Sequence, residues 1–227
     1  LLFVANIIVT GTSRGIGFET VNALLDQGHQ VLALSRTEMK LQHSRLDLLR
    51  TLSVDLAQND LSVVLQAIED WTQVDGIVHN AGSFMHKPFV QTTTDDFLAL
   101  YRVNVFAVAE LTRIVDSKLK QGAHVVGISS MGGIQGSSKF AGLSAYSSSK
   151  GALITLFELL AEEYQSRGVS FNSLALGAVQ TEMLEAAFPG IKAPVSAAQM
   201  GAYVARFVLE GHRFFNGKVL PVSSSTP

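Results

Sequence analysis

Residues 10–17 read Thr-Gly-Thr-Ser-Arg-Gly-Ile-Gly, and they join an apolar run at 4–9 to an amphipathic segment at 15–27. Glycines at such a junction let the backbone turn tightly and approach a phosphate closely. The N-terminus of the following helix supplies free N–H groups and a partial positive charge. The spacing G-x-x-x-G-x-G therefore predicts a phosphate-binding turn between the first strand and the first helix of an α/β fold.

The same stretch contains a second motif, because residues 11–15 also match G-x-S-x-G, the nucleophile elbow of α/β-hydrolases. Ser13 would be the nucleophile in that interpretation. An α/β-hydrolase carries its nucleophile well inside the sheet, whereas Ser13 would follow the first strand. Arg14 beside the glycines also suits a phosphate better than an ester. A hydrolase that uses Ser13 stays as an alternative from another reaction class.

The rest of the chain alternates short apolar runs with longer amphipathic segments. Strands are predicted at residues 4–9, 31–34, 52–54, 76–79, 123–128, 170–175 and 218–222. Helices are predicted at residues 15–27, 38–50, 58–73, 94–120, 145–167 and 196–210. This alternation predicts an α/β fold with a doubly wound sheet of about seven parallel strands and helices on both faces. No linker and no repeat divides the chain, so residues 1–227 are expected to form one domain.

Composition limits the partners and the compartment. Of the 227 residues 47% are hydrophobic and 16% charged, and the net charge is −2, so neither nucleic acid nor an anionic membrane is implied as a partner. No apolar stretch approaches the roughly 18 residues that a membrane span needs. The chain contains no cysteine, which fits a reducing, cytoplasmic location. Residues 1–9 lack a basic leader, so we expect a buried first strand there rather than a signal peptide.

Two of the predicted helices are apolar on nearly every side. They span residues 94–120 and 145–167, and in the second one residues 152–161 are mostly apolar. A helix that is apolar all round must be covered all round, whereas a helix in the outer layer of an α/β fold has an exposed back. We therefore expect 94–120 and 145–167 to form the subunit interface of a homodimer or homotetramer.

Ser35 and Arg36 end the second predicted strand. In dinucleotide-binding folds an acidic residue near this point binds the ribose 2′-hydroxyl of NAD and repels the 2′-phosphate of NADP. Here Arg36 takes that place, and Arg14 lies on the glycine turn nearby. Two guanidiniums can bind a phosphate through charge-assisted hydrogen bonds. The pattern favours NADP(H) over NAD(H).

Tyr146 and Lys150 lie four positions apart at the start of a predicted helix, so their side chains share one face. A free tyrosine titrates near pH 10, which is too high for proton transfer at neutral pH. Lowering its pKa by about three units requires about 4 kcal/mol. One cation about 4 Å away contributes an interaction energy of this order at an effective dielectric of 20, so Lys150 would be a sufficient cause. Ser147 and Lys150 also match the S-x-x-K of β-lactamases, but the sequence has neither S-D-N nor K-T-G, so we reject that interpretation.

Further motifs stand in order around this pair, and with them the sequence resembles the short-chain dehydrogenase/reductase family over essentially its whole length. The motifs are the glycine turn at 10–17, Asp55, Asn80-Ala81-Gly82, Asn104, Ser130, Tyr-x-x-x-Lys at 146–150, and Asn172 with the segment 177–181. His79 stands where the family usually has Asn. The resemblance implies a single Rossmann-type domain that interconverts a carbonyl and an alcohol by hydride transfer with a nicotinamide cofactor.

The resemblance also implies a role for each motif residue. Tyr146 would exchange a proton with the substrate oxygen, and Ser130 would hydrogen-bond that oxygen. Lys150 would lower the pKa of Tyr146 and bind the nicotinamide ribose, while Asn104 would hold a water that links Lys150 to a proton path. Asp55 would bind the adenine amine. The implied cofactor-binding residues are Gly11, Ser13, Arg14, Gly15, Ile16, Gly17, Ser35, Arg36, Asp55, Leu56, Asn80, Ala81, Gly82, Tyr146, Lys150, Gly177, Val179 and Thr181.

The stretch after Gly177, roughly residues 178–195, is expected to form a lid over a small-molecule substrate. The side chains expected in the substrate pocket are Met131, Phe140, Met183, Leu184 and Phe188. A ketone, an aldehyde or the matching alcohol fits the motifs, and a 3-oxoacyl thioester is one candidate. A catalytically inactive NADP-binding regulatory protein is a further alternative, although Tyr146 and Lys150 are both present. The six histidines lack metal-ligand spacing, so no metal site is expected.

Overall fold

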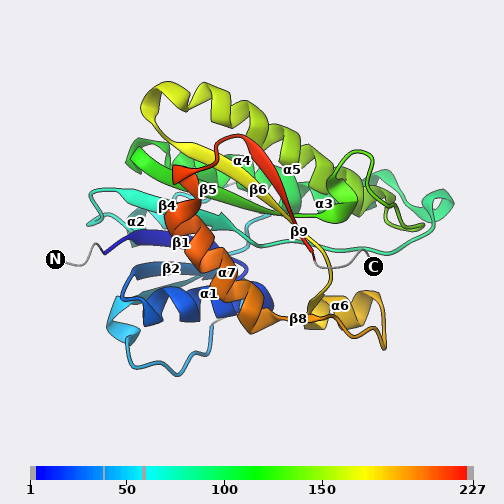
Figure 1. Cartoon of the computed structure of the whole chain (residues 1–227), viewed down its shortest axis with the longest axis horizontal. Helices are drawn as coiled ribbons and strands as arrows, with labels where there is room; N and C mark the ends of the chain where they lie inside the picture. The colour runs from blue at the N-terminus through cyan, green and yellow to red at the C-terminus, as the bar shows by residue number, and fades with distance from the viewer. Residues whose placement is uncertain (1–3, 38, 58–59, 224–227) are drawn as a thin grey trace.

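A computed structural model of the chain describes residues 4–37, 39–57 and 60–223. Within these residues, seven parallel strands form one sheet in the order β3-β2-β1-β4-β5-β6-β9 (Figure 1). The strands are β1 (Asn6–Thr10), β2 (Gln30–Ser35), β3 (Leu49–Ser53), β4 (Val74–His79), β5 (Leu119–Ser130), β6 (Ser170–Leu176) and β9 (Lys218–Val222). The predicted doubly wound sheet of seven parallel strands is confirmed.

The order of the strands reverses between β1 and β4. From β1 the chain adds β2 and β3 on one side, and β4, β5 and β6 follow on the other side. The carboxyl ends of β1 and β4 therefore lie at a topological switch point, which is where open α/β sheets bind their ligands. Residues 10–17 and 80–82 follow these two strands, so the fold brings two of the sequence motifs to the same place.

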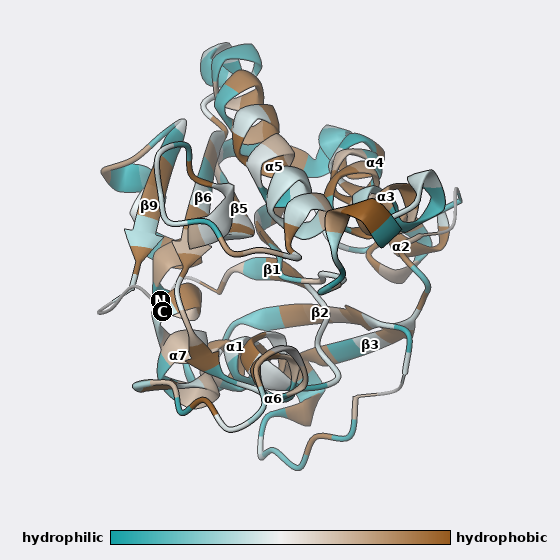
Figure 2. Cartoon of the chain, turned by 90° about the vertical axis from the view of Figure 1, so that its right-hand side faces the viewer, coloured by the Kyte–Doolittle hydropathy of each residue, from teal (hydrophilic) through white to brown (hydrophobic). Residues whose placement is uncertain are grey.

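Helices cover both faces of the sheet, so its central strands are buried on both sides (Figures 1 and 2). One apolar core lies between the sheet and α1 and α7, and it includes Leu24 and Val204. The other lies between the sheet and α2, α4 and α5, and it includes Leu111 and Phe157. The helices are α1 (Gly15–Asp26), α2 (Val63–Ala67), α3 (Thr94–Tyr101), α4 (Ala107–Ile114), α5 (Ser144–Glu163), α6 (Glu182–Ala187) and α7 (Ala197–Glu210). Among the described residues, none of the helices combines the length and apolar character needed to cross a bilayer.

The predicted lid, residues 178–195, contains α6 between two short strands. These strands, β7 (Val179–Gln180) and β8 (Val195–Ser196), pair with each other in parallel. Thr181 caps α6, because its Oγ1 accepts a hydrogen bond from the Leu184 N–H at 3.2 Å. The lid is thus tied at both of its ends, and α6 lies beyond the carboxyl edge of the sheet on the side of α1 (Figure 2).

The prediction of a helix at residues 38–50 is wrong. Residue 38 lies outside the described residues, and apart from a 3-10 turn at Leu46–Leu48 the rest of the segment is not helical. Its apolar residues Met39 and Leu41 are two positions apart, which does not fit a helical period. β3 begins at Leu49, earlier than the predicted strand at 52–54, because the segment gains a parallel ladder with β2.

The helix predicted at residues 58–73 is reduced to α2. Residues 58 and 59 lie outside the described residues, and the Asp60 carboxylate accepts the Ser62 N–H at 2.9 Å, so a turn directly precedes α2. After α2 the chain turns again to bury Trp71 before it enters β4. Turn chemistry and the burial of one large side chain therefore override the helical pattern at both ends.

The helix predicted at residues 94–120 is interrupted and shorter. A π-helical turn at Arg102–Phe106 separates α3 from α4, and α4 ends at Ile114. The Asp116 carboxylate accepts hydrogen bonds from Tyr164 Oη at 2.6 Å and from Arg167 Nη1 at 2.5 Å, which holds a 3-10 turn after α4. β5 consequently starts at Leu119, before the predicted strand at 123–128.

Candidate active site

The glycine turn is braced against the end of β4. The Asn80 side-chain amide donates to the carbonyl oxygens of Thr10 and Gly11, both at 3.0 Å, and the Ala81 N–H donates to Thr10 Oγ1 at 2.9 Å. The approach is so close that a Cβ on Gly11 would lie 2.7 Å from Ala81 Cα, and a Cβ on Gly17 would lie 2.3 Å from Gly11 O. The glycines are therefore required by packing across the switch point as well as by the left-handed φ of 72° at Gly11.

A pocket of about 590 Å³ lies beside the N-terminus of α1. Its lining residues are Ser13, Arg14, Gly15, Phe18, Glu19, Gln180, Thr181, Glu182, Glu185 and Ala197. Among the described residues, no side chain caps the start of α1, and its first turn contains no acidic residue. The N–H groups of this turn can therefore bind an anion. This arrangement fits the pyrophosphate of a dinucleotide. Glu182 and Glu185 line the same pocket because they occupy the first turn of α6, where its dipole favours acidic side chains.

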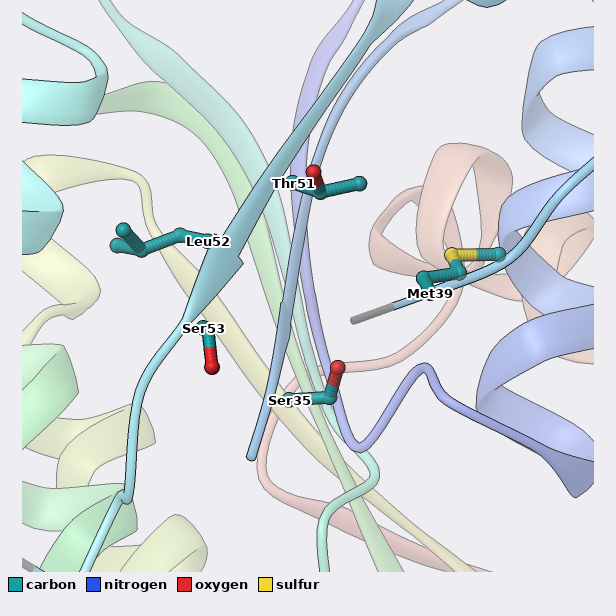
Figure 3. A pocket seen from close by; sticks show the side chains of 5 residues that line it. All are labelled: Ser35, Met39, Thr51, Leu52 and Ser53. Atoms are coloured by element: carbon teal, nitrogen blue, oxygen red, sulfur yellow. The ribbon is translucent and has the colours of Figure 1, made fainter. Parts of the chain in front are cut away.

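The end of β2 lies beside a second pocket of about 280 Å³. Figure 3 shows Ser35 and Thr51 directed toward Met39 on one side of β2 and β3, while Leu52 points to the other side. Ser35 is buried and donates to Thr37 O at 2.6 Å, whereas the Arg36 side chain is exposed. The Arg36 guanidinium is thus exposed to solvent where β2 ends.

Some of the other predicted cofactor residues make polar contacts within the protein, and others pack in or against the apolar cores. One carboxylate oxygen of Asp55 accepts the Ala57 N–H at 3.0 Å, so only part of this side chain is engaged within the protein. Gly177 lies under the C-terminal strand, and its N–H donates to Val222 O at 3.1 Å. Four predicted side chains belong instead to the apolar cores or pack against them: Leu56 and Val179 are buried in the cores, and Ile16 and Ala81 are partly buried against them.

Ser130, Tyr146 and Lys150 come together where β5 ends and α5 begins. Tyr146 and Ser130 share a side-chain hydrogen bond, and Ser130 Oγ also accepts the Gly132 N–H at 3.2 Å. Lys150 is buried, and its Nζ lies 5.9 Å from the centre of the Tyr146 ring. The neighbouring Ser129 points away, because its Oγ donates to Lys150 O at 3.0 Å. The alternation along β5 thus directs Ser130 toward the phenol.

Burial dominates the electrostatics of this group. Burial raises the pKa of Tyr146, and the hydrogen bond with Ser130 lowers it only in part. Burial also lowers the pKa of Lys150 to about 8. The expected lowering of the Tyr146 pKa by Lys150 is therefore not observed in this structure. The Lys150 ammonium donates instead to Ile128 O at 2.8 Å.

Asn104 lies in the π-helical turn and links the segment after β4 to α5. Its Nδ2 donates to Ser83 O at 3.0 Å and to Ser149 Oγ at 2.9 Å, and its Oδ1 accepts the Ser83 N–H at 2.8 Å. Ser149 is buried, and its Oγ donates to Tyr146 O at 2.7 Å. Asn104 is therefore linked through Ser149 to the backbone of Tyr146. A Cβ on Gly82 would lie 3.3 Å from Lys150 Nζ and 3.5 Å from Asn104 Oδ1, so these groups meet closely.

Aromatic rings lie next to the phenol. The rings of Phe84 and Tyr146 pack edge to face with centres 5.0 Å apart, and Phe84 also lies 6.4 Å from Phe188. The Phe188 ring is in turn 6.5 Å from Phe140 and 6.2 Å from His86. Of the five predicted pocket residues, Phe140 and Phe188 thus belong to this cluster. Met131 lies in the 3-10 turn after Ser130, while Met183 and Leu184 lie on α6.

Sequence reasoning missed three residues of the site: Phe84, His86 and Ser149. The first two follow the Asn-Ala-Gly motif at the carboxyl end of β4, and this position is the only signal that could have identified them. A serine within a helix carries no signal at all.

Five of the six histidines take part in local hydrogen bonds, and the ring of His212 packs 5.7 Å from that of His124. His79 Nε2 pairs with Thr112 Oγ1 at 3.0 Å, and His124 lies between Val208 O at 3.1 Å and the Asn172 amide at 2.9 Å. Burial lowers the pKa of His79 to about 3 and that of His124 to about 4. In the part of the chain that the structure describes, no three histidine or acidic side chains gather as a metal site would require.

With this geometry in view, comparison with known proteins decides the family. A family model described as short chain dehydrogenase matches residues 5–192. The chain belongs to the short-chain dehydrogenase family. It is accordingly an oxidoreductase of this family, whose members act on CH–OH groups with NAD(P). An α/β-hydrolase using Ser13 is not supported.

Individual short-chain dehydrogenases give the extent of the similarity. The chain is 34% identical to an L-xylulose reductase of Mesocricetus auratus over 78% of this chain and 72% of that protein. It is 31% identical to the oxidoreductase BOA17 of Botryotinia fuckeliana over 77% of this chain, and the match spans 65% of that longer protein. A short chain dehydrogenase of Burkholderia cenocepacia solved in complex with NADP superposes with a TM-score of 0.83, at 26% identity over 99% of this chain and 98% of that one.

Proposed function

We propose that the protein is an NADP(H)-dependent carbonyl reductase that converts a ketone or aldehyde to the alcohol, or catalyses the reverse reaction. The observation that carries this proposal is the convergence of Ser130, Tyr146 and Lys150 beside a switch point whose glycine turn fits a pyrophosphate. When bound, the cofactor supplies the hydride that forms the new C–H bond at the carbonyl carbon. The residues of the chain control the proton and the orientation of the substrate.

Tyr146 is the proton donor in this proposal. Because burial raises its pKa, the phenol is protonated at neutral pH and can donate its proton to the carbonyl oxygen as the C–H bond forms. Ser130 hydrogen-bonds the same oxygen as negative charge develops there. A proton from solvent then restores the phenol, while the Lys150 Nζ lies 5.9 Å from the centre of the Tyr146 ring. Asn104 and Ser149 hold the first turn of α5 in the required position.

The preference for NADP(H) rests on charge at the cofactor end of the site. Arg36 directly follows β2 with its side chain exposed, and Arg14 lines the pocket at the start of α1. Both are suited to the 2′-phosphate, whereas no acidic side chain stands at the Arg36 position to bind a free ribose hydroxyl. The Burkholderia cenocepacia relative binds NADP, which agrees with this choice.

Self-association is the second part of the proposal. Exposed apolar side chains lie on the π-helical turn before α4 and on α5, where Phe106 and Leu159 are 52% and 58% exposed. A second copy of the chain would cover them, as expected for a homodimer or homotetramer. The cytoplasmic location expected from the lack of cysteine stays a prediction.

The proposed function is tested by following NADPH oxidation over a panel of ketones and aldehydes and identifying the alcohol formed. We expect turnover with at least one carbonyl, one alcohol appearing for each NADPH consumed. Tight NADPH binding without turnover of any carbonyl would instead favour an inactive regulatory NADP-binding protein. A 3-oxoacyl thioester belongs in the panel, because it is one candidate substrate.

A further inference from the structure

Four rings from three separate segments gather beside the proposed catalytic phenol. Phe84 and His86 come from the segment after β4, Phe140 from the loop before α5, and Phe188 from the end of α6 in the lid. The Phe84 ring meets Tyr146 at 5.0 Å and at an interplanar angle of 64°. The rings therefore begin directly at the phenol and continue into the lid.

Phe188 is the centre of this cluster. Its ring lies 6.2 to 6.5 Å from the rings of Phe84, Phe140 and His86, and the three interplanar angles fall between 61° and 64°. Aromatic rings favour such tilted arrangements because the positive edge of one ring faces the negative face of another. The lid thus packs against the rest of the protein near Tyr146 through aromatic rings. The edges and faces of these rings could pack against the aromatic ring of a ligand in the same way.

The backbone around the cluster is held in place. The Lys87 N–H donates to Gly142 O at 2.9 Å, and His86 Nε2 lies 3.1 Å from Ala141 O. Gly142 has a φ of 81°, and a Cβ there would lie 2.7 Å from His86 Nε2. The segment after β4 and the loop before α5 are therefore joined directly beneath the rings, so the positions of Phe84 and Phe140 are coupled.

Charged groups near the cluster are already engaged. Lys87 Nζ pairs with Asp96 at 2.6 Å, and Lys139 Nζ donates to Ile134 O at 2.6 Å and to Ser137 Oγ at 2.7 Å. Both lysines in the two segments that carry Phe84 and Phe140 are thus used within the protein. The described part of this wall therefore offers ring surface rather than free lysine cations for a carboxylate or a phosphate.

We propose that the substrate carries an aromatic ring next to its carbonyl group, as an aryl ketone or aryl aldehyde does. The aryl ring packs with Phe84 and Phe188 while its carbonyl oxygen faces Tyr146 and Ser130. Reduction then gives the benzylic alcohol and the oxidised cofactor. The hydride comes from the reduced cofactor and the proton from Tyr146. This inference rests on the proposed function and makes Phe84 and Phe188 specificity-determining residues.

The test compares two ketones that differ only in the aromaticity of one ring, acetophenone and cyclohexyl methyl ketone. We expect the ratio of their kcat/KM values to fall about threefold to tenfold in Phe84→Leu and in Phe188→Leu, because leucine keeps apolar contact but loses the ring–ring interaction. The ratio should not change in the control Phe214→Leu, whose side chain is 77% exposed before β9. Comparing the ratio between variants cancels both the intrinsic reactivity of the ketones and the amount of folded enzyme.

Two results would overturn the inference while leaving the reductase intact: a higher kcat/KM for L-xylulose or an acetoacetyl thioester than for acetophenone, or an unchanged ratio in both leucine variants. If no carbonyl is turned over, the proposed function fails instead. Calorimetry of the product alcohols with the NADP-loaded protein then decides the inference separately. Tighter binding of 1-phenylethanol than of 1-cyclohexylethanol would support the aromatic site, and equal binding would refute it.

Discussion

At the scale of single residues, burial raises the pKa of the Tyr146 phenol and so keeps it protonated at neutral pH. The interval between Tyr146 and Lys150 predicted that the two side chains share a helix face, and they do. The interval could not predict that burial raises the pKa of the phenol, since burial depends on segments far away in the sequence. The same limit hid Ser149, whose partner Asn104 lies 45 positions away.

Ser149 is therefore the sharpest residue-scale test. Ser149→Ala removes the link between Asn104 and Tyr146 O and leaves a buried amide donor without this partner, at a cost of about 1–3 kcal/mol. We expect kcat to fall about tenfold, because the first turn of α5 no longer holds the phenol in line. The dissociation constant of NADPH should change little.

The matched control for this variant is Ser148→Ala. Ser148 is exposed and its Oγ donates only within the helix, to Ala145 O at 3.1 Å. Steady-state kinetics and fluorescence titration with NADPH measure both variants. Equal kcat values for the two would show that Ser149 does not position Tyr146.

At the scale of elements, the alternating pattern predicted the sheet well and the helices less well. Buried strands such as β2 are continuous apolar runs, which the sequence displays directly. The break at Arg102–Phe106 and the loss of the helix at 38–50 depend on hydrogen bonds and strand pairing between distant segments, which periodicity does not contain. Of the aromatic cluster, Phe140 and Phe188 were predicted as pocket residues, whereas Phe84 and His86 were missed, because separate segments of the chain must meet to form it.

The end of β2 carries the prediction on cofactor choice. Arg36→Asp replaces an exposed guanidinium with a carboxylate that repels a 2′-phosphate and can bind the ribose hydroxyl of NADH. We expect the ratio of NADPH to NADH affinity to fall at least tenfold, measured as dissociation constants by fluorescence titration. Arg206→Asp makes the same change of charge on the exposed side of α7 and should leave the ratio unchanged. An unaltered ratio in Arg36→Asp would show that Arg36 does not contact the phosphate.

At the scale of the whole molecule, buried histidines predict a weakened fold in acid. Burial holds the pKa of His79 at about 3, while in the unfolded chain it is about 6.5. Below pH 6.5 the unfolded chain therefore binds a proton that the folded chain excludes, so stability falls as the pH falls. From pH 6.5 to 4.5 this contribution amounts to about 2–3 kcal/mol.

The residue that the family usually has at this position supplies the variant. His79→Asn removes the titrating group, so the free energy of unfolding should fall less between pH 7.0 and 4.5 than it does in the unmodified chain. Urea unfolding at the two pH values measures this difference, and any constant loss from the smaller side chain cancels within each protein. Identical pH dependence in the two proteins would refute the account of His79.

The central claim is that Tyr146 donates the proton when the carbonyl is reduced. It is tested most directly by the single-turnover rate of NADPH oxidation in Tyr146→Phe, measured by stopped flow with the best carbonyl of the panel. We expect a rate at least 100-fold below that of the unmodified protein, with the NADPH dissociation constant within about twofold. A rate in Tyr146→Phe close to that of the unmodified protein would contradict it.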